Sequence, residues 1–379
     1  MTAFCTKQDL FEARTGGYHV YRIPGLTVTR NGVVLAYTEA RQGRGGDWDP
    51  IDIRMRRSED GGLTWEPPFT AIDHRDFDAE QPVNNFNCIA SSDTGDVHAV
   101  FCQDYARAYY TRSTDDGQTW QSPVEITHVF EQFREHYPWR VIAIGPGHGI
   151  QLTTGRLIAP VWMSDGSSQE FGADKRGHRP SEVAAIYSDD SGATWHASDM
   201  IVRNEPRFRH PNETCVVELS DGTVLFNSRT ESHHHRRIVT TSPHGSGQFS
   251  EPRFDEALLE PICFGSIVSV PGTGNILFAN PGVLERTMPG GPKDRGIGPG
   301  ETGRIYDRKY LTIRLSRDDC ASWTVARRLE HGPSGYSDLT ALPDGTVLCL
   351  YECGLVDRMF DDRYLRLARF NVEWVEDAD

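Results

Sequence analysis

A short pattern centred on turns recurs along the whole chain and limits the folds that it can adopt. Six times, an apolar run leads into a Gly-containing turn, and a second apolar run follows it. This is the sequence signal of a β-hairpin, because glycine readily adopts the positive φ that a tight turn requires. The turns contain Gly32, Gly95, Gly155, Gly222, Gly274 and Gly345. They recur about every 63 residues in a chain of 379, so six similar units account for its length.

A second repeat follows the hairpins in phase. The pattern Ser-x-Asp-x-Gly-x-Thr-Trp occurs at residues 58–65, 113–120 and 188–195. Residues 316–323 form a fourth copy that lacks the glycine, and residues 242–249 form a more degenerate fifth copy. In such a turn, Asp and Ser bond to backbone amides, glycine supplies a positive φ, and tryptophan packs between strands. We call these copies Asp boxes and predict that their role is structural and not catalytic.

The composition also favours many short strands. The chain contains 36 Gly and 22 Pro, which interrupt long helices. Six units of about four strands are typical of a propeller, in which ring closure leaves no long sheet edge exposed. We predict an all-β fold, a six-bladed β-propeller with four-stranded antiparallel blades. No linker divides the chain, so residues 1–379 are expected to form one domain, with residues 364–372 and the N-terminal segment completing the last sheet.

The net charge restricts the classes of partner. Asp and Glu number 54 against 39 Lys and Arg, which gives a net charge of −15 and argues against nucleic acid or an anionic membrane as partner. No stretch reaches the roughly 18 apolar residues of a membrane span. Residues 1–8 lack the apolar core of a secretory signal. No membrane insertion is expected and the cytoplasm is slightly favoured, although a secreted mature form stays open, as does the oligomeric state.

Neither a metal nor a cofactor is expected. The eight cysteines are dispersed, mostly within apolar runs, which favours buried free thiols over disulfides or a zinc site. Three consecutive histidines, residues 233–235, have no Cys or acidic cluster beside them, so an exposed loop is the favoured interpretation. Glycine loops of the phosphate-binding kinds are absent from the sequence.

The hairpins also predict which residues meet at their open ends. Paired positions around a two-residue turn add to a constant, so the turn fixes the partner of each residue. The pairs of interest are Arg22 opposite Arg41, Glu213 within one residue of facing Arg229, and Tyr336 within one residue of facing Glu352. In a propeller these ends converge around the axis. Two facing arginines are unfavourable alone, so an anion or nearby carboxylates are expected between them.

Several segments together resemble a known family. Tyr21-Arg22-Ile23-Pro24 followed by the Asp boxes resembles the bacterial-type sialidase (exo-α-neuraminidase) family. The other matching segments are Asn212-Glu213, residues 227–229, residues 312–314, residues 335–339 and residues 350–352. The resemblance covers nearly the whole chain. It implies a single catalytic six-bladed propeller that releases terminal α-linked sialic acid, a nine-carbon 2-ulosonic acid with a carboxylate on its anomeric carbon.

The resemblance implies a set of residues that bind this carboxylate. Arg22, Arg229 and Arg314 match the arginine triad of the family. Guanidinium suits this role because it stays charged and presents a fork of donors to two oxygens. Glu352 matches the carboxylate that orients the first arginine, and Arg41 is a supporting basic residue.

The resemblance also implies the catalytic residues. Tyr336 matches the nucleophile and Glu213 its general base. A neutral phenol avoids the repulsion that a carboxylate nucleophile would meet at an anomeric carbon already bearing a carboxylate, and Glu213 can take its proton. Such tyrosine nucleophiles are a recognised exception among glycosidases.

The acid/base is expected on the loop that follows the first hairpin. Asp47 has the spacing of the family, and a Gly-rich loop can close it over the substrate. Asp49 is the second candidate, and Asp52, in an alternating run, is favoured as structural. Burial under bound substrate would raise the pKa of the acid/base and keep it protonated for the leaving group.

Parts of the specificity stay open. In the second blade, residues 84–87 read Asn-Asn-Phe-Asn where some relatives place an acidic residue, so the preferred acyl group is not fixed. Residues 137–149 and 178–182 are expected to shape subsites, with His148 either contacting the glycerol chain or serving a turn. Two alternatives to a sialidase remain. One is the same mechanism on a deaminated or eight-carbon 2-ulosonic acid, and the other is a non-catalytic propeller that binds glycans.

Overall fold

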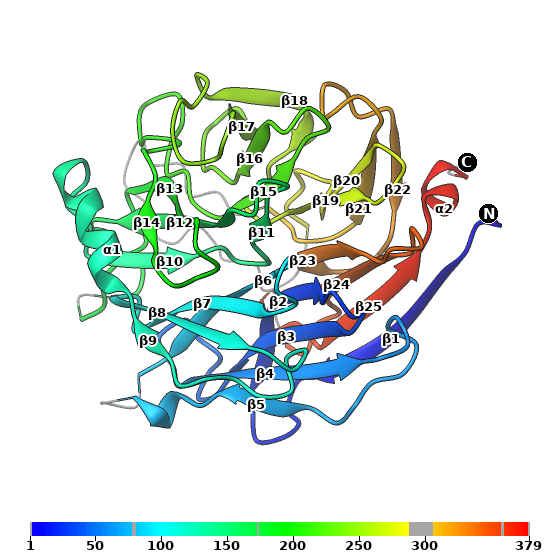
Figure 1. Ribbon diagram of the computed structural model, residues 1–379, viewed down its shortest axis with the longest axis horizontal. Coiled ribbons are helices and arrows are strands. Elements are labelled where there is room, and N and C mark those ends of the chain that lie inside the picture. Colours follow the sequence, from blue (N-terminus) through cyan, green and yellow to red (C-terminus); the bar gives the residue numbers. More distant parts are fainter. Residues whose placement is uncertain (1, 78–80, 173, 288–305, 358–359, 378–379) are drawn as a thin grey trace.

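Six antiparallel sheets surround a central axis, as Figure 1 shows in a view of the computed structural model. The structure describes residues 2–77, 81–172, 174–287, 306–357 and 360–377. Within these residues, five sheets have four strands and one has five, because the short strand β11 pairs with β12 beside β10. The expected six-bladed β-propeller with four-stranded blades is confirmed. Among the described helices, none has both the length and the apolar character needed to cross a membrane.

Each blade runs in sequence order from the axis outward, apart from the last. The first three blades contain β2 (Val20–Val28), β3 (Val34–Arg41), β4 (Ile51–Ser58) and β5 (Phe69–Ile72); β6 (Val83–Ala90), β7 (Val97–Gln103), β8 (Arg107–Ser113) and β9 (Val124–Glu125); and β10 (Val141–Ile144), β11 (Ile150–Gln151), β12 (Leu157–Ser164), β13 (Ser181–Ser188) and β14 (His196–Ala197).

The fourth and fifth blades contain β15 (Thr214–Glu218), β16 (Val224–Ser228), β17 (Arg236–Ser242) and β18 (Arg253–Leu259); and β19 (Ser266–Val270), β20 (Asn275–Pro281), β21 (Leu311–Ser316) and β22 (Val325–Arg328). The sixth contains β23 (Ser334–Ala341), β24 (Val347–Cys353), β25 (Tyr364–Phe370) and β1 (Cys5–Glu12). The short helices are α1 (Thr127–Glu131) and α2 (Val372–Glu376), with one-turn 3₁₀ helices at His74–Asp76 and Gln132–Glu135.

The two ends of the chain close the ring. Strand β1 is the outer strand of the last blade and pairs antiparallel with β25, from Cys5 opposite Phe370 to Glu12 opposite Tyr364. The termini therefore lie on one side of the molecule (Figure 1). This pairing was expected from the sequence and is confirmed.

The core lies between the blades. The described residues form six apolar clusters, one at each interface between neighbouring sheets. In the first blade, for example, Leu35 and Ile53 face the second blade, whereas Val34 and Ala36 face the sixth. Alternate residues of a strand point to opposite faces of its sheet, so each inner strand contributes to two interfaces. This packing fixes every blade between two neighbours.

A buried carboxylate ties several blades together near the axis. Asp338 in β23 accepts hydrogen bonds from Leu26 N at 2.8 Å, Ser266 Oγ at 2.7 Å and His148 Nδ1 at 2.9 Å. These donors belong to or lie beside the first, fifth and third blades, so one side chain of the sixth blade connects four blades. We call this group the axial hub.

The Asp boxes form compact turns. In the first box, Asp60 Oδ1 accepts from Ser58 Oγ and from Thr64 N, both at 2.8 Å, and Gly62 N donates to Ser58 Oγ at 2.8 Å. The fourth box has the same bonds although Cys320 stands where Gly62 stands in the first. Cys320 adopts a φ of 64°. The side chains can therefore hold this turn even around a residue that disfavours a positive φ.

The cysteines and the histidine run are as expected. All eight cysteines are free, and all but Cys5 are buried. His233 and His234 are exposed in the turn between β16 and β17, and His235 contacts Tyr306.

Candidate active site

The register at the open ends of the hairpins agrees with two of the three predicted pairs. Thr214 faces Ser228, and Arg229 N donates to Glu213 O at 2.9 Å, so Glu213 and Arg229 lie opposite each other. Tyr336 N donates to Glu352 Oε2 at 3.0 Å across the β23–β24 hairpin. Both predictions are confirmed.

The third predicted pair was wrong. Arg22 faces Glu39, and Arg41 faces Val20. The register shifts between Arg22 and Gly25, where Ile23 adopts a φ of 57°. Beside the turn, Val28 faces Val34, so the turn has one residue more than the two-residue turn that the prediction assumed, and the bulge shifts the register by one further residue. The carboxylate of Glu39 therefore lies where a second arginine was expected.

Tyr336, Glu213 and Arg229 form one hydrogen-bonded group. The hydroxyl of Tyr336 donates to Glu213 Oε1, while Arg229 Nη1 donates to Tyr336 Oη at 2.7 Å and also to Glu213 Oε2. Burial raises the pKa of Tyr336, and the nearby charge of Arg229 only partly offsets this. The phenol is therefore neutral and hydrogen-bonded to a carboxylate that can accept its proton.

Glu352 holds Arg22 against this group. Arg22 donates to Glu352 from Nε at 3.1 Å and from Nη2 at 3.3 Å, and Ile23 N donates to the same carboxylate at 3.1 Å. Burial would raise the pKa of Glu352, but the charges of Arg22 and Arg308 and two backbone donors lower it. The guanidinium carbon of Arg22 lies 5.4 Å from the centre of the Tyr336 ring.

A third arginine at the site is Arg308, which the sequence analysis missed. Its guanidinium carbon lies 4.9 Å from the centre of the Tyr336 ring, and its Nη2 donates to Ile262 O at 2.9 Å. Arg308 lies just before β21, at the same open end as the other site residues. A search for arginines just before the start of a strand could have identified Arg308.

The structure does not bring Arg314 into this group. Arg314 lies in the middle of β21, and its Nη1 donates to Asn280 Oδ1 at 3.0 Å. Burial lowers its pKa to about 10, with the charge of Asp255 opposing the shift. The structure thus places Arg308, and not Arg314, beside Tyr336.

The buried guanidinium groups keep donors free. The Nε atoms of Arg229 and Arg308 are buried and have no hydrogen-bond partner among the described residues. Buried unpaired donors are rare in folded proteins because their desolvation costs about 1 to 3 kcal/mol each. These free donors lie near Arg22, and together the three arginines fit a site that receives an anion.

Arg41 holds Asp47 by an ion pair. Arg41 is fully buried and donates to Glu39 Oε2 from Nε at 2.9 Å and from Nη2 at 2.6 Å. Its Nη1 donates to Asp47 Oδ1 at 2.6 Å. Burial opposes the ionisation of Asp47, but the charge of Arg41, with smaller contributions from His178 and Arg22, lowers its pKa to about 2. The ion pair with Arg41 thus favours the ionised form of Asp47.

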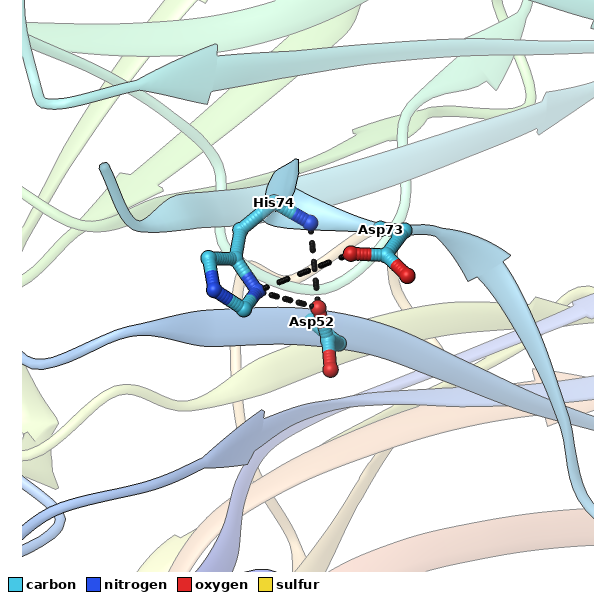
Figure 2. Close-up of side chains that lie close together, drawn as sticks. All are labelled: Asp52, Asp73 and His74. Atoms are coloured by element: carbon cyan, nitrogen blue, oxygen red, sulfur yellow. Dashed lines mark hydrogen bonds and ion pairs between the residues drawn. The ribbon is translucent and has the colours of Figure 1, made fainter. Parts of the chain in front are cut away.

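Asp49, in the same loop, and Asp52, in β4, have other partners. Asp49 Oδ2 accepts from Arg44 N at 2.8 Å and Gly46 N at 2.9 Å, so it holds the loop in shape. Figure 2 shows that Asp52 is bound by His74, whose N and Nδ1 both approach Asp52 Oδ1, at 3.0 and 2.7 Å. Of the three, Asp47 has the contacts that place it beside the arginines.

Among the described residues, the side chains drawn in Figure 2 are also the one group of three whose ligand atoms lie close enough together to hold a metal ion. Ligand atoms of Asp52, Asp73 and His74 lie within 4.8 Å of one another. They already bond to one another and to neighbours, since Tyr18 Oη donates to Asp52 Oδ2 at 2.7 Å and Arg75 N to Asp73 Oδ1 at 2.9 Å. Hydrogen bonding therefore accounts for the cluster.

An aromatic wall borders Asp47. The ring of His178 packs 6.1 Å from Trp48, 4.9 Å from Tyr105, 5.2 Å from Trp162 and 4.6 Å from Phe171. Burial lowers the pKa of His178 to about 4, with the charges of Asp47 and Glu213 opposing the shift. His178 lay in a segment that was expected to shape a subsite, but its side chain was not singled out.

His148 and the asparagines of the second blade, which were candidates for contacts with the sugar, bond to other residues of the protein. His148 bonds to Asp338 in the axial hub, so it serves the fold there. In the second blade, Asn85 N donates to Glu39 Oε1 at 2.8 Å, and Asn87 Nδ2 donates to Gly147 O at 3.1 Å. These asparagines support the Glu39–Arg41 pair and the axis.

Comparisons with known proteins agree with this arrangement. A family model described as a BNR repeat-like domain matches residues 47–349. The chain is 29% identical over 395 residues to a sialidase of Micromonospora viridifaciens, covering 98% of this chain and 54% of that protein. It is 29% identical to human Sialidase-3, covering 88% of this chain and 86% of that protein. The chain thus spans about half of the Micromonospora relative, and 61% of a Bacteroides fragilis sialidase.

Solved structures share the fold. The Hadza microbial sialidase Hz136 superposes with a TM-score of 0.75 at 24% identity, covering 97% of this chain and 69% of that one. A Trypanosoma rangeli sialidase in complex with 2,3-difluorosialic acid superposes with a TM-score of 0.74 at 18% identity, covering 98% of this chain and 59% of that one.

Proposed function

This chain belongs to the family of BNR repeat-like domains, and from that premise we propose that it is a retaining exo-α-sialidase. Its relatives are named sialidases. The observation that carries the proposal is the hydrogen bond from the Tyr336 hydroxyl to Glu213 among three buried arginines. Residues 1–379 act as one catalytic unit, and the substrate is a terminal α-linked sialic acid of a glycan. No metal or cofactor takes part.

The arginines receive the carboxylate of the sugar. Arg22, Arg229 and Arg308 surround the ring of Tyr336, so a carboxylate bound by them sets the anomeric carbon beside the phenol oxygen. Glu352 keeps Arg22 in place before substrate arrives. Orientation of this kind supplies a large part of the rate enhancement, since the reacting atoms need no further search.

Tyr336 then attacks the anomeric carbon. Its oxygen forms the new bond while Glu213 takes the phenol proton, and the bond to the leaving oxygen breaks as Asp47 gives that oxygen a proton. In the second step, Asp47 takes a proton from water, the water oxygen displaces Tyr336, and Glu213 returns the proton to the phenol. Two displacements at one carbon give overall retention.

Asp47 must leave its ion pair to act as an acid. Arg41 is held by Glu39 from two nitrogens, whereas Asp47 stands on the glycine-containing loop of residues 42–47. The loop is therefore the part that moves. Separation from Arg41 and burial under substrate both raise the pKa of Asp47, which then holds a proton near the leaving oxygen.

Turnover of a fluorogenic N-acetylneuraminic acid glycoside by the purified protein tests the proposal. The deaminated counterpart serves as a second substrate, because the arginines recognise a carboxylate that both share. Preference for the deaminated sugar would move the assignment to a related 2-ulosonic acid. Absence of turnover of either, with binding retained, would support a glycan-binding propeller and end the claim of an enzyme.

Replacement of Tyr336 tests the mechanism. Tyr336→Phe removes the nucleophilic oxygen and is expected to lower kcat by roughly a thousandfold or more. The arginines remain, so the Kd of an unsaturated sialic acid analogue should change by less than about tenfold. A kcat within tenfold of wild type would show that Tyr336 is not the nucleophile.

A further inference from the structure

A second carboxylate lies beside the first arginine of the site. Asp362 precedes β25, its Oδ2 lies 3.8 Å from Arg22 Nε, and the residue is 6% exposed. Phe360 packs over the same region, with its ring centre 5.9 Å from the guanidinium carbon of Arg22 and 4.6 Å from that of Arg308. Asp362 belongs to none of the sequence motifs and takes no part in the proposed displacement steps.

The two carboxylates at Arg22 have unequal partners. Glu352 accepts from Arg22 Nε and Nη2, from Ile23 N and from Tyr336 N. Among the described residues, Asp362 forms one ion pair, the 3.8 Å approach of its Oδ2 to Arg22 Nε. Two close carboxylates in a buried place resist simultaneous ionisation, and the proton resides on the one with fewer donors. Asp362 is that carboxylate.

The charges around Tyr336 point the same way. Arg22, Arg229 and Arg308 carry three positive charges, and Glu213 and Glu352 carry two negative ones. With Asp362 uncharged, these five groups carry a net charge of +1, which attracts an anion; Arg41 with Glu39 and Asp47 lies farther from Tyr336. With Asp362 ionised, that charge is cancelled and a carboxylate ligand meets a further negative group at Arg22.

Electrostatics support the uncharged form. Burial, together with the negative charge of Glu352, raises the pKa of Asp362 to about 8. The positive charges of Arg22 and Arg308 oppose this shift, and the charge of Asp361 adds to it. Asp361 itself pairs with His19, 3.1 Å away.

We propose that Asp362 is part of the site that receives the carboxylate of the ligand and that it works there as an uncharged carboxylic acid. This inference rests on the proposed sialidase function. The O–H group of Asp362 supplies a further donor at Arg22 and leaves the groups around Tyr336 with a net positive charge. Loss of that proton removes the donor and the excess charge together, so affinity for a carboxylate falls as the pH rises through the pKa of Asp362.

Direct binding of 2,3-didehydro-N-acetylneuraminic acid, measured by calorimetry at a series of pH values, tests this proposal. In wild type, Kd should be constant below about pH 8 and rise by up to about tenfold per pH unit above it. Asp362→Asn keeps an uncharged donor, so its Kd should stay within about threefold across the same range. Asp357→Asn, which alters an exposed carboxylate paired with Arg14, should keep the wild-type profile.

The outcomes separate this inference from the proposed function. A wild-type Kd that does not change across pH 8, or an Asp362→Asn profile that follows wild type, overturns the role of Asp362 while leaving the sialidase assignment intact. A protein that binds no ligand at any pH and hydrolyses no sialoside overturns both. The wild-type profile alone decides the matter if Asp362→Asn does not fold.

Discussion

At the scale of single residues, a buried donor that is unpaired among the described residues favours Arg308 over Arg314 as the third arginine of the carboxylate site that we propose. Arg308 has a buried Nε without a partner in the described part of the chain and lies over Tyr336. Arg314, in the middle of β21, donates to Asn280 of the neighbouring strand β20. Arg314 was chosen because of its spacing along the sequence. Whether a side chain can bind the ligand depends instead on which end of the strand it lies at, and Arg314 lies in the middle of β21.

Two matched lysine variants test this assignment. Arg308→Lys keeps the charge but loses the planar fork, so we expect the Kd of an unsaturated sialic acid analogue to rise by roughly ten- to a hundredfold. Arg314→Lys should change that Kd by less than about threefold, because its guanidinium does not reach the site. Calorimetric titration of both variants gives the comparison. The reverse order of effects would restore Arg314 to the triad.

The choice between Asp47 and Asp49 is testable through the leaving group. Asp47→Asn removes the proton donor, so hydrolysis of a sialoside with an alcohol leaving group should fall by roughly a hundredfold or more. Hydrolysis of an activated aryl sialoside should fall much less, because a phenolate departs without much protonation. Relative kcat/KM values for the two substrates measure this contrast.

Asp49→Asn is the control for that experiment. Asp49 bonds to backbone amides of the same loop, so its loss should affect both substrates about equally. A leaving-group dependence in Asp49→Asn that exceeds the one in Asp47→Asn would exchange their roles.

At the scale of strands and turns, the hairpin pattern predicted most of the fold because glycine turns and alternating apolar residues are local signals. It placed Glu213 opposite Arg229 and Tyr336 beside Glu352. It failed at Arg22 for two reasons: the turn is one residue longer than assumed, and the bulge at Ile23 involves a contact from outside the hairpin, the bond from Ile23 N to Glu352 of the last blade. Where distant residues determine the register of a strand, the sequence of its hairpin alone does not reveal that register.

The Asp boxes should contribute to stability and not to catalysis. In the third box, Asp190 accepts from Thr194 N at 2.8 Å, Thr194 Oγ1 at 2.6 Å and Ser188 Oγ at 2.8 Å. Asp190→Ala should lower the free energy of unfolding by about 1 to 2 kcal/mol. Its kcat should match wild type. Urea denaturation and a rate assay measure the two quantities.

The neighbouring residue provides the control. Asp189 forms an exposed ion pair with Arg156, so Asp189→Ala should change the free energy of unfolding by less than about 1 kcal/mol. Equal destabilisation by the two substitutions would contradict a special role for the box.

At the scale of the whole molecule, the axial hub links blades that are far apart in sequence. Asp338 is 1% exposed and accepts from Leu26, Ser266 and His148. Asp338→Asn replaces one of the two acceptor oxygens by a donor and leaves buried donors poorly paired. We expect the free energy of unfolding to fall by about 2 to 4 kcal/mol, as measured by urea denaturation.

A turn aspartate separates this effect from a general loss of charge. Asp344 lies exposed in the last hairpin turn and accepts from Thr346 N at 2.8 Å. Asp344→Asn should shift the urea midpoint much less than Asp338→Asn. An unchanged midpoint in Asp338→Asn would show that the neighbouring sheets hold the ring without the hub.

The pairing of β1 with β25 has a consequence for how the protein is made. Phe4 N donates to Asn371 Oδ1, a contact between residues 367 positions apart. Strand β1 leaves the ribosome long before its partner is translated, so five blades can assemble while this first strand waits unpaired. The ring closes only when β25 has been translated and pairs with β1. Until then the exposed edge of β1 can bind chaperones or pair with an incorrect strand.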